Sequence, residues 1–446
     1  MKRHRVSVTG LIALMAAAGL TLGQTPPPSG LLWVDAAGRP GHHARQALQV
    51  LDEAAADALD PADYESSRLR QLAEELAGPQ APTVEAAARF DAALTAAIER
   101  YLQHLRYGRV DPRALGLFLP PRTDRDDIPA MLREHLERDR LVELVERMRP
   151  PFAEYGALRD ALPRYRALTS AAAGGPPPPS AALQVRKIEL AMERLRWLPD
   201  LGDGRLIMLN IPTFTIHAWD HALKGAPALT MRAIVGRAAV SQTPVFSKTM
   251  EAVIFRPYWN VPPSILHKEI LPVLRKDRDY LRREDMEIVR GAGDDAVPVE
   301  ATPEQLMLLE QGALRLRQRP GPKNALGLVK FVFPNEEQVY LHGTPAPRLF
   351  ARDRRDLSHG CVRVENPAGL AEWVLTGEPG WGRERIRAAM ADGASVSRQV
   401  RLKQPVPVML FYTTATVSAG NGEVHFADDI YKLDAALDAA LTRARR

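Results

Sequence analysis

The sequence predicts a multi-domain α+β fold in which a helical N-terminal scaffold precedes a mostly β domain. From Leu31 to about Thr169, apolar residues recur at the spacing of an α-helix. After Arg205, short apolar runs alternate with turn residues, which is typical of strands. Between the two parts, a Gly/Pro-rich stretch over 171–182 marks an extended linker. The 446 residues, of which 46% are hydrophobic, suffice for two or three domains with sizeable cores.

The predicted helical domain covers 31–170. Its expected helices run over 44–59, 83–105, 128–148 and 152–168, with prolines breaking the runs between them. Tyr101 and Tyr107 fall in this predicted domain, and we interpret both as core residues rather than ligands. A connecting helix within 183–203 is expected to follow the linker.

The predicted β domain covers 204–418, and a C-terminal segment over 419–446 is expected to end in a helix. Strands are expected over 206–211, 213–219, 228–235, 250–255, 327–333, 338–341 and 406–413. One long insertion, about 262–316, is charged and is predicted to be a helical cap. Long insertions in compact domains are often lids or binding elements. A solvated decoration is the alternative interpretation.

The first 23 residues are typical of a secretory signal. A basic start at 2–5 precedes an apolar run over 6–22, cleavage sites lie between Ala18 and Gly23, and an exposed spacer is expected over 24–30. An uncleaved membrane anchor is the alternative. Either interpretation predicts an exported, periplasmic protein. The net charge of +5 comes from scattered basic residues interleaved with acidic ones, so we expect no nucleic-acid partner.

Cys361 is the only cysteine of the chain and lies in the segment Ser-His-Gly-Cys-Val-Arg over 358–363. Exported proteins usually hold their cysteines in disulfide pairs, so a single thiol favours use as a nucleophile. A buried, inert cysteine is the alternative. A nucleophilic thiolate needs a base or a lowered pKa, and His342, nineteen residues upstream, is the candidate base.

The neighbours of these two residues are candidates for supporting roles. The carbonyl group of Gly343 is placed to orient the ring of His342. Gly360 permits a tight turn, and the backbone amides around it are candidates for an oxyanion hole. His359 and Ser358 are expected to support this loop or the oxyanion rather than to act as the base.

Arg363 is a candidate for holding a substrate carboxylate, because it lies two residues after the cysteine and shares its side of a strand. A structural ion pair with Asp353, Asp356 or Glu365 is the alternative for this arginine.

A metal site competes with the thiol interpretation. His342, His359 and Cys361 are permissible zinc ligands, but their spacing matches no common structural zinc pattern. We therefore expect neither a metal nor another cofactor.

At these residues the chain resembles the L,D-transpeptidases of bacterial cell walls. Their YkuD-type catalytic domain carries a histidine, a gap, then Ser/Thr-His-Gly-Cys, a hydrophobic residue and Arg or Asn. His342 and the segment 358–363 match this pattern. The resemblance implies that Cys361 is the acyl-accepting nucleophile, that His342 is the base and that the Gly343 carbonyl orients it. Tyr340 matches a tyrosine that lines the site in the family.

Other segments resemble the larger, multi-domain branch of that family, which has a helical scaffold and a substrate-capping insertion. They are 60–64, 107–112, 192–199, 243–246, 258–265 and 320–327. Trp259 and Asn324, within the two segments that bracket the insertion, are further candidate substrate-binding residues. Many members carry a peptidoglycan-binding module where this chain has only the linker. Substrate capture is therefore expected to rest on the cap, the scaffold or a partner.

The resemblance implies an exported L,D-transpeptidase that acts on peptidoglycan stem peptides. Cys361 would attack the diaminopimelate carbonyl of a tetrapeptide donor, D-alanine would leave, and the amine of an acceptor stem would resolve the thioester. Water as the acceptor would make the enzyme an L,D-carboxypeptidase, and a lipoprotein lysine would make it an anchoring enzyme. A catalytically silent wall scaffold is the third alternative. Glycan synthases and carboxypeptidases are the candidate protein partners, and an active thiol is expected to be acylated by carbapenems.

Overall fold

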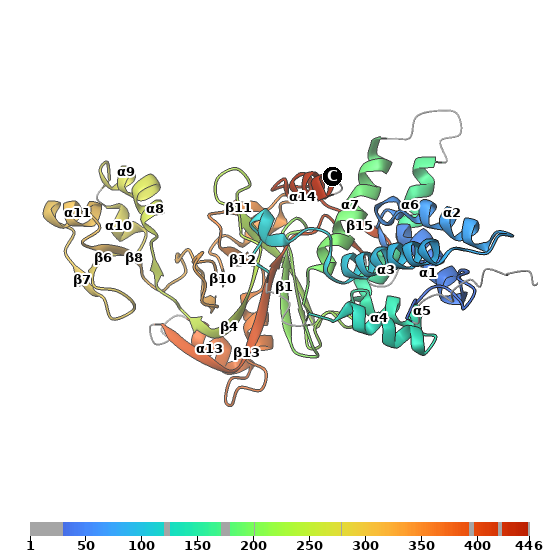
Figure 1. Ribbon diagram of the computed structural model, residues 1–446. Coiled ribbons are helices and arrows are strands. Elements are labelled where there is room, and N and C mark those ends of the chain that lie inside the picture. The colour runs from blue at the N-terminus through green and yellow to red at the C-terminus, as the bar shows by residue number, and fades with distance from the viewer. Residues whose placement is uncertain are drawn as a thin grey trace, which may run out of the picture.

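The computed structural model describes residues 30–119, 125–170, 179–199, 201–277, 279–391, 397–417 and 422–444. The expected leader and nearly all of the expected spacer lie outside these residues. Within them, no helix is both long and apolar enough to cross a membrane. Three parts lie in a row: a helical domain, a central β domain and an inserted subdomain (Figure 1).

The N-terminal domain is built from short helices packed around one buried core, as predicted. They are α1 His42–Asp52, η1 Glu53–Asp57, η2 Pro61–Tyr64, α2 Ser66–Ala77, α3 Val84–Tyr107, η3 Pro112–Leu115, α4 Ile128–Glu137 and α5 Leu141–Met148. Trp33, Tyr64, Phe90 and Tyr101 lie among the buried residues of this core. The helix predicted over 128–148 is in fact two helices, because the chain turns at Asp139, whose φ is +55°.

Two longer helices, α6 Ala153–Ser170 and α7 Pro179–Arg196, join the helical domain to the β domain. Because α7 begins at Pro179, the linker is shorter than the predicted 171–182, and 171–178 lie outside the described residues. Both helices share their buried core with the β domain. Glu193 on α7 is buried and accepts backbone hydrogen bonds from Arg109 (2.5 Å) and Val110 (3.1 Å). A charged hydrogen bond in a buried position fixes this junction.

The β domain is a nine-stranded sheet that closes on itself. Its strands are β1 Leu206–Asn210, β2 Thr215–Trp219, β3 Leu229–Gly236, β4 Phe246–Phe255, β9 Val329–Val332, β10 Leu341–His342, β11 Asp356–Ser358, β12 Val362–Val364 and β13 Arg398–Phe411. Their order is β11-β3-β12-β10-β9-β4-β13-β1-β2, and β2 also pairs with β3. This last pairing completes a circuit, so that the sheet encloses a core.

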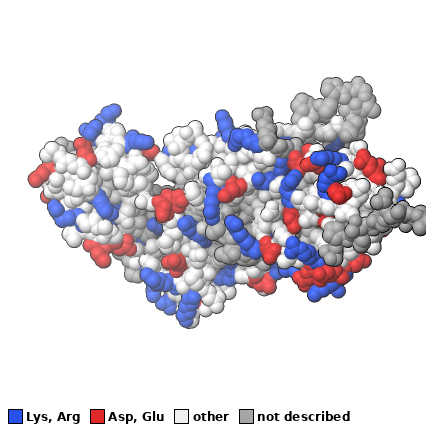
Figure 2. Space-filling model, in the orientation of Figure 1, with Lys and Arg blue, Asp and Glu red and all other residues white. Residues whose placement is uncertain are grey.

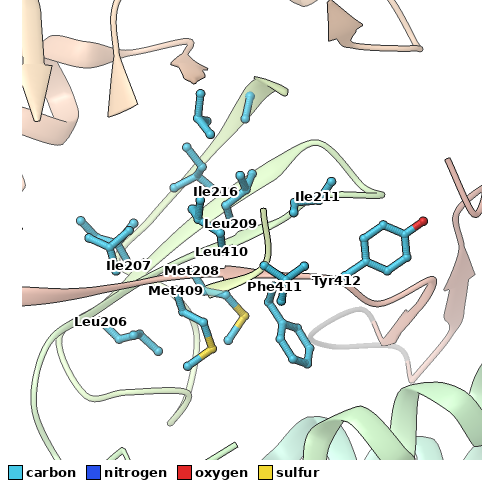
Figure 3. Close-up of a cluster of buried hydrophobic side chains, with 14 of the residues drawn as sticks. Leu206, Ile207, Met208, Leu209, Ile211, Ile216, Met409, Leu410, Phe411 and Tyr412 are labelled. Atoms are coloured by element: carbon cyan, nitrogen blue, oxygen red, sulfur yellow. The ribbon is translucent and has the colours of Figure 1, made fainter. Parts of the chain in front are cut away.

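The interior of this sheet is apolar. Figure 3 shows side chains of β1, β2 and β13 clustered there, among them Ile207, Leu209, Ile216 and Leu410, all fully buried. Burying one such side chain stabilises the fold by about 1.5–3 kcal/mol. The strand β13 comes from the C-terminal part of the chain and lies between β4 and β1. The barrel therefore includes a strand that follows all the others in the sequence.

Smaller elements complete the β domain. They are α12 Pro367–Val374, α13 Arg383–Met390, β14 Ala415–Val417, β15 Val424–Phe426 and the C-terminal helix α14 Leu433–Ala444. The predicted terminal helix is present as α14, and Arg194 of α7 forms a buried ion pair of 2.6 Å with its residue Asp434. Figure 2 shows basic and acidic side chains interspersed on the visible face rather than gathered into one patch.

The insertion is a subdomain with a core of its own, and it is only partly helical. It contains β5 Trp259–Asn260, α8 Pro263–Ile265, the π-helix η4 Leu266–Ile270, α9 Leu271–Leu274, α10 Tyr280–Arg283, β6 Met286–Arg290, β7 Val297–Val299, α11 Pro303–Glu310 and β8 Arg315–Gln318. The sequence predicts a helical cap, but the cap also contains a four-stranded sheet in the order β5-β8-β6-β7, which corrects that prediction. Figure 1 shows this cap at the end of the molecule opposite the helical domain.

Candidate active site

Two neighbouring strands carry the histidine and the cysteine. The strands β10 and β12 are parallel, with Leu341 opposite Val362 and His342 opposite Arg363. Leu341 and Val362 are fully buried in the barrel core. Because side chains alternate along a strand, His342 and Arg363 point to the other face of the sheet. Tyr340 and Cys361, two positions before His342 and Arg363 respectively, share that face.

This face forms the floor of a cavity of about 830 Å³ between the sheet and the cap. The sheet contributes Tyr340, His342, Cys361 and Arg363 to its lining, and the cap contributes Trp259 together with residues of η4 and β8. The structure therefore brings together most of the predicted site residues in one cavity. A stem peptide entering this space would contact the sheet and the cap at once.

Cys361 is half-buried and lies just before β12. Its sulfur lies 3.7 Å from the carbonyl oxygen of Gln338. Burial raises the pKa of the thiol, and Tyr340, Lys330 and Arg363 act in the opposite direction. With the raised pKa, the resting cysteine is a thiol at neutral pH, so its attack requires a base.

His342 is buried, and its Nδ1 lies 2.6 Å from the carbonyl oxygen of Gly343. A carbonyl only accepts hydrogen bonds, so Nδ1 carries the proton and Nε2 keeps a free lone pair. Burial, and next the charge of Arg363, lower the pKa of His342 to about 3. The ring is therefore neutral at neutral pH, and Nε2 is the nitrogen that carries the lone pair. A neutral ring with one unprotonated nitrogen is the form in which a histidine acts as a general base.

Gly327 packs closely against the backbone of Gly343. A Cβ atom on Gly327 would lie 2.5 Å from the backbone nitrogen of Thr344 and 2.7 Å from the carbonyl carbon of Gly343, and its φ is +65°. Only glycine fits both this backbone conformation and this close approach.

Replacing Gly327 with alanine is expected to displace the Gly343 carbonyl and to lower kcat/KM at least about a hundredfold, because small misplacements of catalytic groups cost that much. The strained backbone is also expected to cost about 1–3 kcal/mol of stability. Steady-state kinetics and thermal unfolding measure the two effects. Gly321→Ala is the matched control, because a Cβ there meets nothing within 4 Å. Equal activity in the two variants would contradict this role of Gly327.

The loop before Cys361 is held by its own hydrogen bonds. The hydroxyl of Ser358 donates to the carbonyl of Cys361 (2.6 Å) and accepts from the amide of Gly360 (3.2 Å), whose φ is +118°. Thr243, a buried residue with no predicted individual role, donates to the Gly360 carbonyl (2.8 Å). The Gly360 amide is thus engaged within the loop. The oxyanion role predicted for it requires that substrate replace this hydrogen bond.

His359 points to the cap. Its Nε2 lies 2.6 Å from a carboxylate oxygen of Glu269 on the π-helix η4, and Arg237 lies 3.9 Å from the same oxygen. His359, two residues before Cys361, therefore links the loop that carries Cys361 to the insertion. This contact supports a binding role for the cap over the alternative of a solvated decoration.

Removing the carboxylate in Glu269→Ala is expected to loosen the cap. An exposed pair of this kind contributes about 0.5–1 kcal/mol, so amide hydrogen exchange over 266–274 is expected to rise about two- to fivefold, with a higher KM. Hydrogen exchange read by mass spectrometry checks this. Glu310→Ala is the control, because Glu310 pairs with Arg275 inside the cap. The link is contradicted if both variants exchange alike.

Arg363 lies in the cavity without an ion-pair partner among the described residues. Two of the three carboxylates considered for it are engaged elsewhere, Asp356 with Arg354 and Glu365 with Arg232, and Asp353 forms no ion pair with it among the described residues. The Nε of Arg363 is buried and has no hydrogen-bond acceptor within the described part of the chain. An unpaired guanidinium group in a cavity favours an anionic ligand.

Asn324 does not line the cavity, which corrects the prediction that it binds substrate. It is fully buried, and its amide nitrogen donates to the carbonyls of Pro257 and Arg319, each at 3.0 Å. Its side-chain oxygen accepts from the amide of Leu326 (2.8 Å). Asn324 therefore fixes the segment that leads from the cap back into β9.

The three residues named as permissible zinc ligands, His342, His359 and Cys361, are not grouped around one point. The ring of His342 bonds to a backbone carbonyl, while His359 points away to Glu269. Over the described residues, no three His, Cys, Asp or Glu side chains are grouped to hold a metal ion.

Lys330 is a residue of the cavity that the sequence analysis did not single out. It lies opposite His342 in the pairing of β9 with β10, and it lines the cavity floor. The sequence feature that could have identified Lys330 is a single cation between the apolar residues Val329 and Phe331 of a predicted strand. Several cations of the cap instead pair with acidic residues of the cap, as in Arg275–Glu310, Arg282–Asp279 and Arg283–Asp277.

Two known protein families match separate parts of the chain. Residues 204–381 match the YkuD family, described as the L,D-transpeptidase catalytic domain. Residues 29–162 match the Scaffold family, described as a scaffold domain. A Haemophilus influenzae (strain ATCC 51907 / DSM 11121 / KW20 / Rd) protein named "Putative L,D-transpeptidase" is 32% identical over 255 residues, which are 57% of this chain and 49% of the relative. The chain thus spans about half the length of that relative.

Proposed function

Because the chain carries an L,D-transpeptidase catalytic domain of the YkuD family at residues 204–381 and a Scaffold domain at residues 29–162, we propose that it is a cysteine acyltransferase that cross-links peptidoglycan stem peptides. The observation that supports this most is that a neutral His342, whose ring is oriented by the Gly343 carbonyl, and the half-buried Cys361 line one cavity. The unpaired Arg363 beside them supports an anionic substrate. Stem peptides, which are rich in carboxylates, satisfy this requirement.

The proposed first half-reaction forms a thioester. His342 accepts the proton of the Cys361 thiol at Nε2, and the sulfur attacks the diaminopimelate carbonyl of a tetrapeptide donor. The tetrahedral intermediate collapses with cleavage of the C–N bond to the terminal D-alanine. The amine of D-alanine takes the proton from His342 and leaves.

In the second half-reaction, the amine of an acceptor stem attacks the thioester carbonyl and gives a proton to His342. The C–S bond breaks, the thiolate regains that proton, and a cross-link between two diaminopimelate residues remains. The reaction follows ping-pong kinetics and uses only side chains of this protein. Trp259 and the cap would cover the acceptor stem. We propose that the reaction takes place in the periplasm after export.

Mass spectrometry of muropeptides tests the acceptor. Purified protein is incubated with tetrapeptide muropeptides, and dimers that lack one D-alanine are the expected product. Tripeptides alone would mean that water is the acceptor and would replace the proposal by an L,D-carboxypeptidase. Attachment of a tripeptide stem to an added lipoprotein lysine would mean an anchoring enzyme. Intact tetrapeptides, together with a thiol that carbapenems do not acylate, would point to a silent scaffold.

A further inference from the structure

Lys330 is a half-buried lysine whose amine lacks the usual partner. Its Nζ lies 4.0 Å from the centre of the Tyr340 ring, which is a cation–π contact. Throughout the described parts of the chain, no carboxylate forms an ion pair with it. Lysines are seldom buried without a counter-charge, because removing an ammonium group from water is costly. An unpaired buried amine that faces a catalytic cavity therefore points to a charge that appears during the reaction.

The sheet fixes this amine beside the reacting groups. Across neighbouring strands, Lys330 lies opposite His342, and His342 lies opposite Arg363. Tyr340, whose ring holds the ammonium group, precedes His342 by two residues and so shares its face of the sheet. Cys361 lies beside Tyr340, because the next amide, that of Val362, bonds to the Tyr340 carbonyl (3.1 Å). Two strand pairings and one ring contact thus direct the lysine toward the thiol.

We infer that Lys330 is a positioning residue whose ammonium group stabilises the Cys361 thiolate that forms when His342 removes the thiol proton. The proton moves from the sulfur to Nε2 of His342, and Lys330 keeps its own proton throughout. The inference assumes the proposed function in assigning this thiolate to peptidoglycan chemistry. The electrostatic effect itself is a property of the resting protein and is measurable without any peptide substrate.

The charges around the thiol agree with this assignment. Burial lowers the pKa of Lys330. Among its neighbours, Cys361 raises this pKa most, and Asp294 of the turn between β6 and β7 raises it less. The other charged or titratable groups that act on the thiol are Tyr340 and Arg363. Lys330 and Arg363 both disfavour a protonated His342. Lys330 and Arg363 thus stabilise the thiolate form of Cys361 and disfavour the imidazolium form of His342. Both effects fit a resting state in which the thiol and the imidazole are neutral and become charged only when the thiol attacks.

A neutral Lys330 acting as the base itself is the competing role, and arginine separates the two roles. Arginine keeps a positive charge at every working pH and cannot serve as a base. Under the electrostatic role, Lys330→Arg retains the thiol reactivity that Lys330→Met and Lys330→Gln lose. Under a base role, all three variants lose it.

The experiment measures alkylation of Cys361 by iodoacetamide against pH, in the full-length protein and its variants. Cys361 is the only cysteine, so one rate reports one site. In Lys330→Met and Lys330→Gln, the inflection of the rate is expected to move about one pH unit upward, which is about tenfold less thiolate below the inflection. The rate itself falls less, because a thiolate of higher pKa is the better nucleophile. The inflection is therefore the decisive quantity.

The matched control is Lys248→Met, which removes a lysine from β4 outside the cavity and is expected to leave the inflection unchanged. An unchanged or lowered inflection in the Met and Gln variants overturns the inference, and so does an arginine variant that behaves like methionine. Thermal unfolding identifies a variant that fails to fold, and the other neutral variant then supplies the result. A shifted inflection without any muropeptide turnover would retain the role of Lys330 and reject the proposed function instead.

Discussion

Replacing Cys361 with alanine is expected to abolish both thioester formation and cross-linking. The sulfur is the atom that would accept the acyl group, and no second cysteine exists in the chain to replace it. Losing a nucleophile lowers turnover by about four orders of magnitude or more, since only binding and local dipoles remain. Intact-protein mass spectrometry with a carbapenem measures acylation, and muropeptide analysis measures turnover.

Cys361→Ser is the informative companion of this variant. Serine keeps the shape of the side chain but is a far weaker nucleophile at neutral pH, and a neutral His342 provides limited activation. We expect no detectable acylation in either variant and thermal unfolding close to that of the parent protein, because Cys361 is half-buried and outside the barrel core. Turnover that persists in the alanine variant would remove Cys361 from the reaction and the proposed function with it.

The sequence was most predictive where a local pattern and the tertiary structure agree. The segment 213–219 alternates apolar and polar residues, and β2 lies there because one face of a barrel strand is buried. The pairs that β13 makes in the barrel were not predictable, since β4 and β1 lie about 150 and about 200 residues earlier in the chain. The parallel pairing of β10 with β12 belongs to the same class of long-range contacts. The resemblance to a family placed His342 and Cys361 together, and local pattern alone did not.

The errors have physical causes. Met286–Arg290 and Arg315–Gln318 are charged segments, and their strand structure comes from pairing with each other rather than from their own propensity. Asn324 lies in a Gly/Pro-rich segment, where an asparagine side chain can satisfy backbone groups as well as bind a ligand. Lys330 escaped attention because its meaning depends on which strand lies next to it. For the two cap strands and for Lys330, the deciding partner lies on another strand.

Replacing His342 with glutamine is expected to lower kcat/KM by about three orders of magnitude, because general bases contribute about 10²–10⁴-fold and the resting thiol needs one. The pH profile of the parent protein identifies the same residue. The neutral imidazole is the active form and its pKa lies at about 3, so its protonation does not limit activity near pH 6.5 as an ordinary histidine would. We expect kcat/KM to be flat on the acid side down to about pH 5 and to rise only toward the raised pKa of Cys361.

Stability provides an independent measurement of the same pKa. An unfolded histidine takes up a proton as the pH falls through about 6.5, whereas folded His342 does so only near pH 3. Within that window, this histidine therefore takes up one proton when the protein unfolds. The free energy of unfolding falls by up to about 1.4 kcal/mol for each pH unit below 6.5 in the window. His342→Gln is expected to flatten this acid dependence of the free energy of unfolding. Half-buried His104, whose pKa is lowered to about 4, acts in the same direction, so His104→Gln is the matched control that alters acid stability and leaves turnover intact. An acid limb of kcat/KM near pH 6.5, or a variant as acid-sensitive as the parent, would show that His342 is not the neutral base.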